Sequence, residues 1–184
     1  MARGLTRVEP SFHERIWGTA TLSPWFPDLE RRTGEVWFRG GGDASLLAKF
    51  IFTTANLSVQ VHPADDFARQ YENSRGKTEM WHVLEAEPGA VVAIGFHDRI
   101  TREQFEAALA ERRVEDLLQW VPAQVGDTFF IPAGTVHAIG AGLTLCEIQQ
   151  NSDVTYRLYD YDGRVNCTLT RGSLFRIGSL TTVR

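Results

Sequence analysis

Short runs in which apolar residues alternate with polar ones occupy much of the first hundred residues. Alternation with period two is typical of β-strands that bury one face, and Gly, Pro, Asn and Asp between the runs favour turns. The polar stretch 64–77 between two such runs predicts a loop or a short helix. The pattern predicts strands at 35–40, 46–53, 56–62, 79–86 and 90–96, with turns at Gly40-Gly41-Gly42-Asp43 and Glu87-Pro88-Gly89.

The apolar period changes around residues 101–120, where a helical insertion is predicted. Thr101 with Gln104 resembles a capping box, and Phe105, Ala108 and Leu109 share one helical face. A second short helix is expected to carry Leu117, Leu118 and Trp120. Alternation then returns, with strands predicted at 128–131, 136–139, 143–149 and 154–160.

Many short strands with one helical excursion predict a mostly β fold, a barrel or a sandwich. No internal repeat or linker divides the chain, so we expect one domain over residues 1–184. Residues 1–34, which include Trp17, Trp25 and Phe26, are expected to form an irregular apolar arm that wraps the barrel at 35–164. Residues 165–184 are expected to form an edge strand or a frayed tail.

Composition narrows the class of protein. The chain has 184 residues, enough for one domain with a sizeable core, and 43% of them are hydrophobic and 23% charged, as in soluble globular proteins. Its net charge of −4 argues against a nucleic-acid surface, and no apolar run reaches the roughly 18 residues needed to span a bilayer. Two isolated cysteines, Cys146 and Cys167, and no export signal favour the cytoplasm.

The strongest local signal for chemistry ends at His137. The segment Gly126-Asp-Thr-Phe-Phe-Ile-Pro132-Ala-Gly134-Thr-Val-His137 fits the pattern G-x5-P-x-G-x2-H that closes a cupin barrel. Pro132 and Gly134 bend the chain sharply after a buried strand, so that His137 begins the next strand and points inward. A lone histidine is more often structural than ligating, but this frame favours a metal ligand.

Partners for His137 are expected on two earlier strands. Residues two apart share one face of a strand, so Ser58, Gln60 and His62 lie together. By the same rule Glu79 faces inward with Trp81, while His82 points the other way and is rejected as a ligand.

The predicted set is one amide oxygen, two imidazoles and one carboxylate, from Gln60, His62, Glu79 and His137. Such an N/O site suits zinc and tolerates manganese, iron, cobalt or nickel. Four protein ligands leave room for water or a substrate hydroxyl, which is typical of a catalytic site. Of 19 basic residues only Lys49 and Lys77 are lysine, and both fall beside this site.

Four long motifs in order resemble the type I mannose-6-phosphate isomerases, particularly their short bacterial branch. They are Leu57 to Pro63, Gly76 to Trp81, Phe129 to Gly140 and Glu147 to Tyr161, and the resemblance covers roughly residues 11–164. It implies a zinc-dependent cupin (jelly-roll) barrel that interconverts mannose 6-phosphate and fructose 6-phosphate through a cis-enediol. In that family the positions of Gln60, His62, Glu79 and His137 are metal ligands.

The resemblance also implies an active site that contains Lys77, Glu147, Asp153 and Arg157. Arg157 does not titrate usefully and would stabilise negative charge, while Lys77, Glu147 or Asp153 could relay the proton. Asp153 could equally cap the turn at Asn151-Ser152-Asp153. Ser58, Lys49 and Arg157 are the expected contacts of the sugar phosphate, although Lys49 could instead be a charge at a strand edge.

Three functions remain open from the sequence. They are a sugar-phosphate isomerase, a metal cupin that acts on another sugar or sugar phosphate, and a cupin that binds or senses carbohydrate without catalysis. A cupin dioxygenase is a further alternative, which Gln60 and the isomerase motifs disfavour. Family members usually continue well beyond the region of resemblance, the short bacterial ones into a second β-sandwich-like domain. The resemblance therefore carries the metal site over more directly than phosphate recognition and cavity closure. A monomer or a homodimer is expected.

Overall fold

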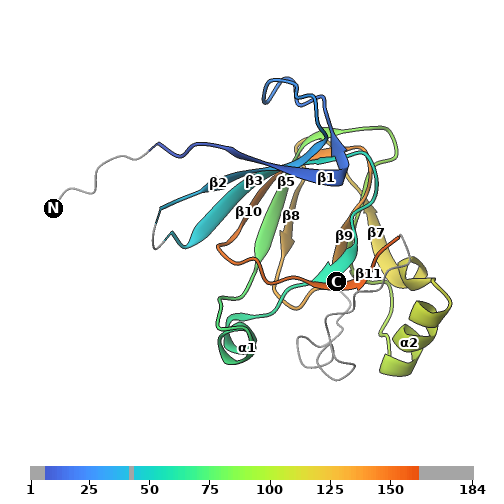
Figure 1. The fold of residues 1–184 in the computed structure, drawn as a ribbon. Helices are drawn as coiled ribbons and strands as arrows, with labels where there is room; N and C mark the ends of the chain where they lie inside the picture. Colours follow the sequence, from blue (N-terminus) through green and yellow to red (C-terminus); the bar gives the residue numbers. More distant parts are fainter. Residues whose placement is uncertain (1–6, 42–43, 162–184) are drawn as a thin grey trace.

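Two antiparallel β-sheets face one another in the computed structural model, which describes residues 7–41 and 44–161 (Figure 1). One sheet has six strands, in the order β1 (Ser11–Thr19), β2 (Thr33–Arg39), β3 (Leu46–Thr53), β10 (Leu143–Gln150), β5 (Glu79–Ala86) and β8 (Thr128–Ile131). The other has five, in the order β11 (Tyr156–Tyr159), β4 (Val59–Val61), β9 (His137–Ile139), β6 (Val91–Phe96) and β7 (Leu118–Pro122). The predicted mostly β, cupin-like fold is confirmed, with its hydrogen bonds divided between two sheets.

The main core lies between the sheets. Strand β10 pairs with β3 on one side and β5 on the other, so its residues lie at the middle of the larger sheet. Inward side chains of this sheet, such as Trp81 and Leu145, pack with Val92 and Ile139 of the smaller sheet, and all four are almost completely buried. Each side chain of this size contributes about 1.5–3 kcal/mol when it is buried. The core therefore holds the two sheets in a fixed relation.

Two helices and a short 3₁₀ turn lie outside the sheets. Helix α1 (Asp65–Tyr71) is the short helix, one of the two alternatives predicted for 64–77, and α2 (Arg102–Ala110) begins with the predicted capping box of Thr101 and Gln104. The described residues contain no helix with the length and apolarity needed to cross a membrane.

The second predicted helix is wrong. Only η1 (Val114–Leu117) is helical there, and Leu118–Pro122 forms strand β7, paired with β6 from Val91 to Phe96. The helical spacing of Leu117, Leu118 and Trp120 is short, and a strand partner supplies hydrogen bonds that such a short helix would lack.

The predicted irregular arm is wrong for residues 11–19, which form edge strand β1 along β2. Charged residues on this strand hide the alternation, because an edge strand has one face and one side open to solvent. The segment 20–32 that follows β1 packs as an apolar arm. Its Leu22 and Phe26 contact Val36 and Phe52 on the outer face of the larger sheet. The predictions for residues 165–184 and for Cys167 lie outside the described residues.

Candidate metal centre

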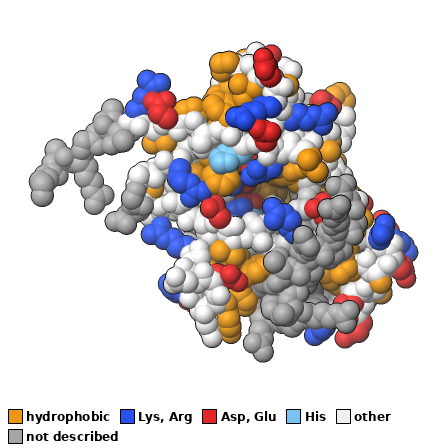
Figure 2. Space-filling model, viewed as in Figure 1, with side chains coloured by type: hydrophobic (Ala, Val, Ile, Leu, Met, Phe, Trp, Pro, Cys, Tyr) orange, Lys and Arg blue, Asp and Glu red, His pale blue; other side chains and the backbone are white. Residues whose placement is uncertain are grey.

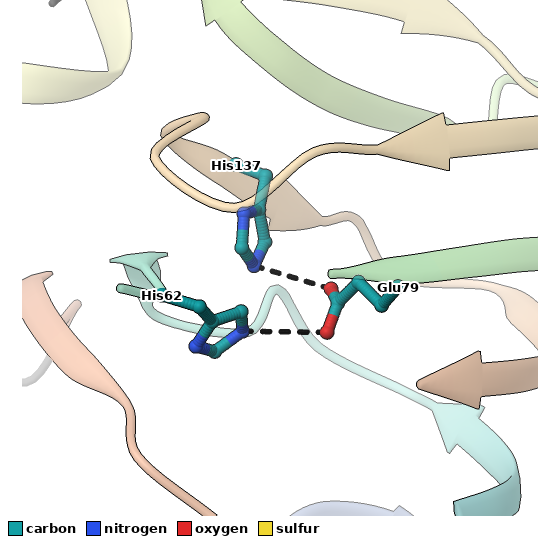
Figure 3. Close-up of side chains that lie close together, drawn as sticks. All are labelled: His62, Glu79 and His137. Atoms are coloured by element: carbon teal, nitrogen blue, oxygen red, sulfur yellow. Dashed lines mark ion pairs between the residues drawn. The ribbon is translucent and has the colours of Figure 1, made fainter. Parts of the chain in front are cut away.

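Three side chains that could hold a metal meet between the two sheets. His62 follows β4, His137 begins the neighbouring strand β9, and Glu79 begins β5 in the other sheet (Figure 3). The carboxylate bridges the imidazoles: Glu79 Oε2 lies 3.3 Å from His62 Nε2, and Glu79 Oε1 lies 3.4 Å from His137 Nε2. All three side chains are buried, with exposed fractions of 2% or less.

The bend predicted at Pro132 and Gly134 places His137. Gly134 has a φ of 87°, a left-handed conformation that favours glycine, and its amide donates a hydrogen bond to the carbonyl of His62 at 2.8 Å. The bend therefore ties the backbone of one ligand to the strand that carries another.

Hydrogen bonds to the backbone orient both imidazoles. The Nδ1–H of His62 donates to the carbonyl of Val154 at 3.0 Å, and that of His137 donates to the carbonyl of Thr135 at 2.9 Å. Each ring then carries its lone pair on Nε2, the nitrogen that faces Glu79. Such backbone contacts fix the tautomer and the ring orientation of metal-binding histidines.

The facing atoms are all acceptors. Both oxygens of Glu79 and Nε2 of His137 are buried and lack a hydrogen-bond partner. Buried acceptors are costly unless a donor or a cation faces them, so their convergence suits a cation-binding site. Ligand atoms that share one metal at about 2.0–2.2 Å lie about 3–3.5 Å apart, and the two Glu79–imidazole distances fall in this range. The residues present therefore fit a divalent metal.

Protonation states also suit a metal site. Burial lowers the pKa of His62 to about 3, with the nearby Lys77 ammonium acting in the same direction, and burial lowers the pKa of His137 as well. For Glu79 burial acts to raise the pKa, but Lys77 and the two imidazoles outweigh it and hold the pKa well below its usual value. Two neutral imidazoles and one carboxylate result, which are the forms that bind metals.

Lys77 lies directly against this centre. Its Nζ is 3.0 Å from Glu79 Oε2, an ion pair without hydrogen-bond geometry, and 3.0 Å from His62 Nε2. Burial acts to lower the pKa of Lys77, but Glu79 and Glu147 outweigh this and raise it. The neighbouring carboxylates therefore favour the ammonium form of Lys77.

Glu147 is the second buried carboxylate of the site. Its Oε2 accepts a hydrogen bond from Trp81 Nε1 at 3.0 Å, and its Oε1 lies 3.0 Å from Lys49 Nζ. The Lys49 ammonium also lies 4.7 Å from the centre of the Trp37 ring. Both predicted residues are thus held in place by neighbouring strands.

A cavity of about 360 Å³ opens beside this cluster. On the face seen in Figure 2, basic and acidic side chains surround a hollow between the described elements. Seven of the residues predicted for the site line the cavity: Lys49, Ser58, Gln60, Lys77, Glu147, Asp153 and Arg157. Gln60 is half-buried on β4, opposite His137 on one side and Arg157 on the other, so its strand position suits the predicted fourth ligand.

Asp153 and Arg157 differ from the buried residues. The Asp153 side chain is 61% exposed and pairs with Arg39 at 3.2 Å, which puts it at the rim of the cavity. Arg157 is exposed on β11, and among residues 7–41 and 44–161 it has no ion-pair partner. Its positive charge is therefore available to an anionic group.

Sequence reasoning missed several residues that line the cavity, among them Arg15, Glu35 and Trp37. Arg15 and Glu35 form an ion pair across β1 and β2, and Trp37 packs under Lys49. Alternation along the predicted strand 35–40 does put Glu35 and Trp37 on one face, but their neighbour β1 was not expected. The rejection of His82 is confirmed, because it is exposed on the opposite face of β5.

Sequence comparisons identify similar proteins. No protein-family model matches the chain. The mannose-6-phosphate isomerase ManA of Bacillus subtilis is 36% identical over 190 residues, which cover 84% of this chain and 60% of that protein. The mannose-6-phosphate isomerase of Streptococcus mutans is 43% identical over 117 residues, covering 64% of this chain and 37% of that protein. The chain thus spans at most about 60% of the length of these curated relatives.

Solved structures give the same picture. The crystal structure of the mannose 6-phosphate isomerase from Bacillus subtilis has a TM-score of 0.84 at 27% identity, over 96% of this chain and 69% of that one. A putative mannosephosphate isomerase from Archaeoglobus fulgidus has a TM-score of 0.77 at 19% identity, over 96% of this chain and 68% of that one. At this lower identity the likeness concerns the fold alone.

Proposed function

This chain belongs to the mannose-6-phosphate isomerase family, and from this premise we propose that it is a metal-dependent aldose–ketose isomerase. Its proposed reaction interconverts mannose 6-phosphate and fructose 6-phosphate through a cis-enediol. The single observation that carries the proposal is the buried group of His62, Glu79 and His137, whose imidazole nitrogens and carboxylate oxygens converge between the two sheets.

The proposed metal ligands are Gln60, His62, Glu79 and His137, with Zn²⁺ as the first candidate ion. A divalent cation bound there would supply positive charge to the substrate oxygens on C1 and C2. The backbone carbonyls of Val154 and Thr135 keep the two imidazoles in the tautomer that such an ion needs.

The proposed substrate site is the adjoining cavity, whose volume of about 360 Å³ lies in the range typical of small-molecule sites. Arg157 would hold or neutralise an anionic group of the sugar phosphate, since a guanidinium stays charged and can bind two oxygens at once. Ser58 and Lys49 line the same cavity and are the other proposed contacts. Lys49 is already paired with Glu147, so its role includes fixing that carboxylate.

Isomerisation moves one proton between C1 and C2 and another between the two oxygens. Lys49, Lys77 and Glu147 are buried titratable groups that line the cavity. Because Lys49 is paired with Glu147, Lys77 and Glu147 are the proposed proton carriers, and either could carry a proton once a substrate lies beside it. Trp81 and Lys49 hold the Glu147 carboxylate in one orientation, which favours a positioned acid or base. Asp153, at the rim and paired with Arg39, remains a candidate only for a relay toward solvent.

A coupled assay on mannose 6-phosphate tests the proposal. Zinc-loaded protein should produce fructose 6-phosphate, and chelation should abolish turnover, with activity restored by added metal. Protein that binds the sugar phosphate without turning it over would support the non-catalytic alternative instead. Protein that neither binds nor converts it would favour a different sugar substrate.

Glu147→Gln, Lys77→Met and Asp153→Asn then separate the proton carriers. The first two should lower kcat by about 100-fold or more, the usual contribution of general acid–base catalysis. Asp153→Asn should have a smaller effect, because the residue is exposed and already engaged by Arg39.

A further inference from the structure

The Lys77 ammonium and a bound metal would compete for the Nε2 lone pair of His62. Its Nδ1–H is used by the carbonyl of Val154, so Nε2 is the only acceptor of the ring. Lys77 Nζ lies 3.0 Å from this atom and donates to it. A metal bound to His62 requires the same lone pair, and one lone pair cannot serve both.

Glu79 adds a second point of competition. Lys77 Nζ also lies 3.0 Å from Glu79 Oε2, the oxygen that faces His62. Both atoms, Glu79 Oε2 and His62 Nε2, belong to proposed metal ligands, and the ammonium now contacts both of them. Two cations so close together in a buried site repel strongly. The ammonium therefore holds a place that the metal needs.

The Lys77 ammonium can move away from the ligand atoms toward the adjoining cavity. Its backbone amide donates to the carbonyl of Pro63 at 3.0 Å, which anchors the main chain beside His62. Its side chain lines the cavity, and four rotatable carbons allow the ammonium to swing while the backbone stays in place. Glu147, which also lines the cavity, offers negative charge on that side.

We propose that the Lys77 ammonium substitutes for the metal in the metal-free protein, and that metal binding displaces it into the substrate cavity. This inference rests on the metal site of the proposed function. It implies that the buried carboxylate is never left without a cation, and that the amine is presented to a substrate only when the metal is in place.

Lys49 provides a matched control. It is the other lysine of the sequence, is equally buried at 5% exposure and lines the same cavity. Its partner is Glu147 at 3.0 Å, a carboxylate outside the proposed ligand set. Replacing either lysine by methionine removes one positive charge near the metal, but only Lys77→Met removes a competitor for a ligand atom.

Zinc affinity, measured by competition with a coloured chelator, tests the proposal without reference to turnover. Lys77→Met should bind Zn²⁺ about 10-fold or more tightly than the wild type, the equivalent of one charge-assisted hydrogen bond that no longer has to be broken. Lys49→Met should show a clearly smaller gain. An affinity of Lys77→Met equal to or below that of the wild type, or no greater than that of Lys49→Met, would overturn the proposal.

A second measurement uses the wild type and so does not depend on the folding of a variant. With only two lysines, protein labelled with ¹³C at lysine Cε should give two lysine side-chain signals, assigned from the spectrum of Lys49→Met. Added Zn²⁺ should change the chemical shift of the Lys77 signal strongly and narrow its line, as expected for a more mobile side chain. The Lys49 signal should change much less. Zinc binding at one equivalent with an unmoved Lys77 signal would refute the displacement and leave the isomerase proposal standing. A failure to bind zinc at all would refute both.

Discussion

At the scale of single residues, the candidate site combines buried charge with unpaired acceptors. Glu79 contributes two oxygens without donors, and Lys77 neutralises its charge only from one side. Breaking such a buried pair by removing one partner is usually more costly than never having built it. A buried carboxylate with an ion-pair partner on one side only favours a second cation on the other side, so the metal proposal depends on Glu79 and Lys77.

The histidines predict how stability depends on pH in the metal-free protein. The pKa of His62 is lowered from 6.5 to about 3 by burial, so the unfolded chain takes up a proton below pH 6.5 that the folded chain does not. Stability should therefore be full above pH 6.5 and fall as the pH drops toward 3, by about 1.4 kcal/mol per pH unit for this one histidine.

Urea unfolding of chelator-treated protein between pH 7 and pH 4 measures this dependence. His137, whose pKa burial also lowers, should add to the slope. His62→Gln should reduce it, while His82→Ala, a change at an exposed histidine, should not. A wild-type slope no steeper than that of His62→Gln would contradict the prediction.

At the scale of elements, the bend between β8 and β9 connects chain geometry to metal binding. Gly134 adopts a φ of 87° and donates to the His62 carbonyl at 2.8 Å, so this one residue sets the start of β9 and the approach of β4. A side chain in this left-handed conformation costs about 1–2 kcal/mol. The bend therefore restricts the positions of two proposed ligands, His62 and His137.

Gly134→Ala is expected to lower both stability and zinc affinity, because a relaxed bend moves His137 away from Glu79. Gly89→Ala is the matched control: Gly89 has a φ of 86° in the turn between β5 and β6, with no neighbour within 4 Å of an added Cβ. Both variants should lose about 1–2 kcal/mol in the free energy of unfolding. Only Gly134→Ala should lose zinc affinity, and equal affinities would show that the bend does not position the ligand.

At the scale of the whole molecule, the candidate metal centre joins the two sheets. His62 directly follows β4 and His137 begins β9, and both strands belong to the smaller sheet. Glu79 begins β5 of the larger sheet. A bound ion would therefore cross-link the sheets at the edge of their shared core. Ligands that bind only the folded state stabilise it by mass action.

Thermal unfolding should show this link. Free Zn²⁺ at about 100 times its Kd should stabilise the wild type by about 2.7 kcal/mol relative to chelator-treated protein. Glu79→Gln should lose most of this response because it replaces the one charged ligand, which faces both histidines, with a neutral amide, whereas His82→Ala should keep it. A full response in Glu79→Gln would place the zinc elsewhere.

Much of this protein could be inferred from local patterns. Alternation placed Glu79 and Trp81 on the buried face of β5 and His82 on the exposed face, as the structure confirms. The glycine and proline spacing before His137 predicted the bend that brings it beside Glu79. Such features depend on the period of a strand and on backbone conformation, which neighbouring residues determine by themselves.

Other features were decided by the tertiary structure. Edge strand β1 and strand β7 exist because β2 and β6 supply their hydrogen bonds, and neither has a strong period of its own. The contact of Lys77 with His62 and the pairing of Lys49 with Glu147 depend on which strands become neighbours and in which register. The sequence by itself therefore determined which faces carry chemistry. Only the packing of the two sheets decided which groups meet. The alternation of residues along a strand determines the face on which a side chain lies, but strand order and register determine its neighbours.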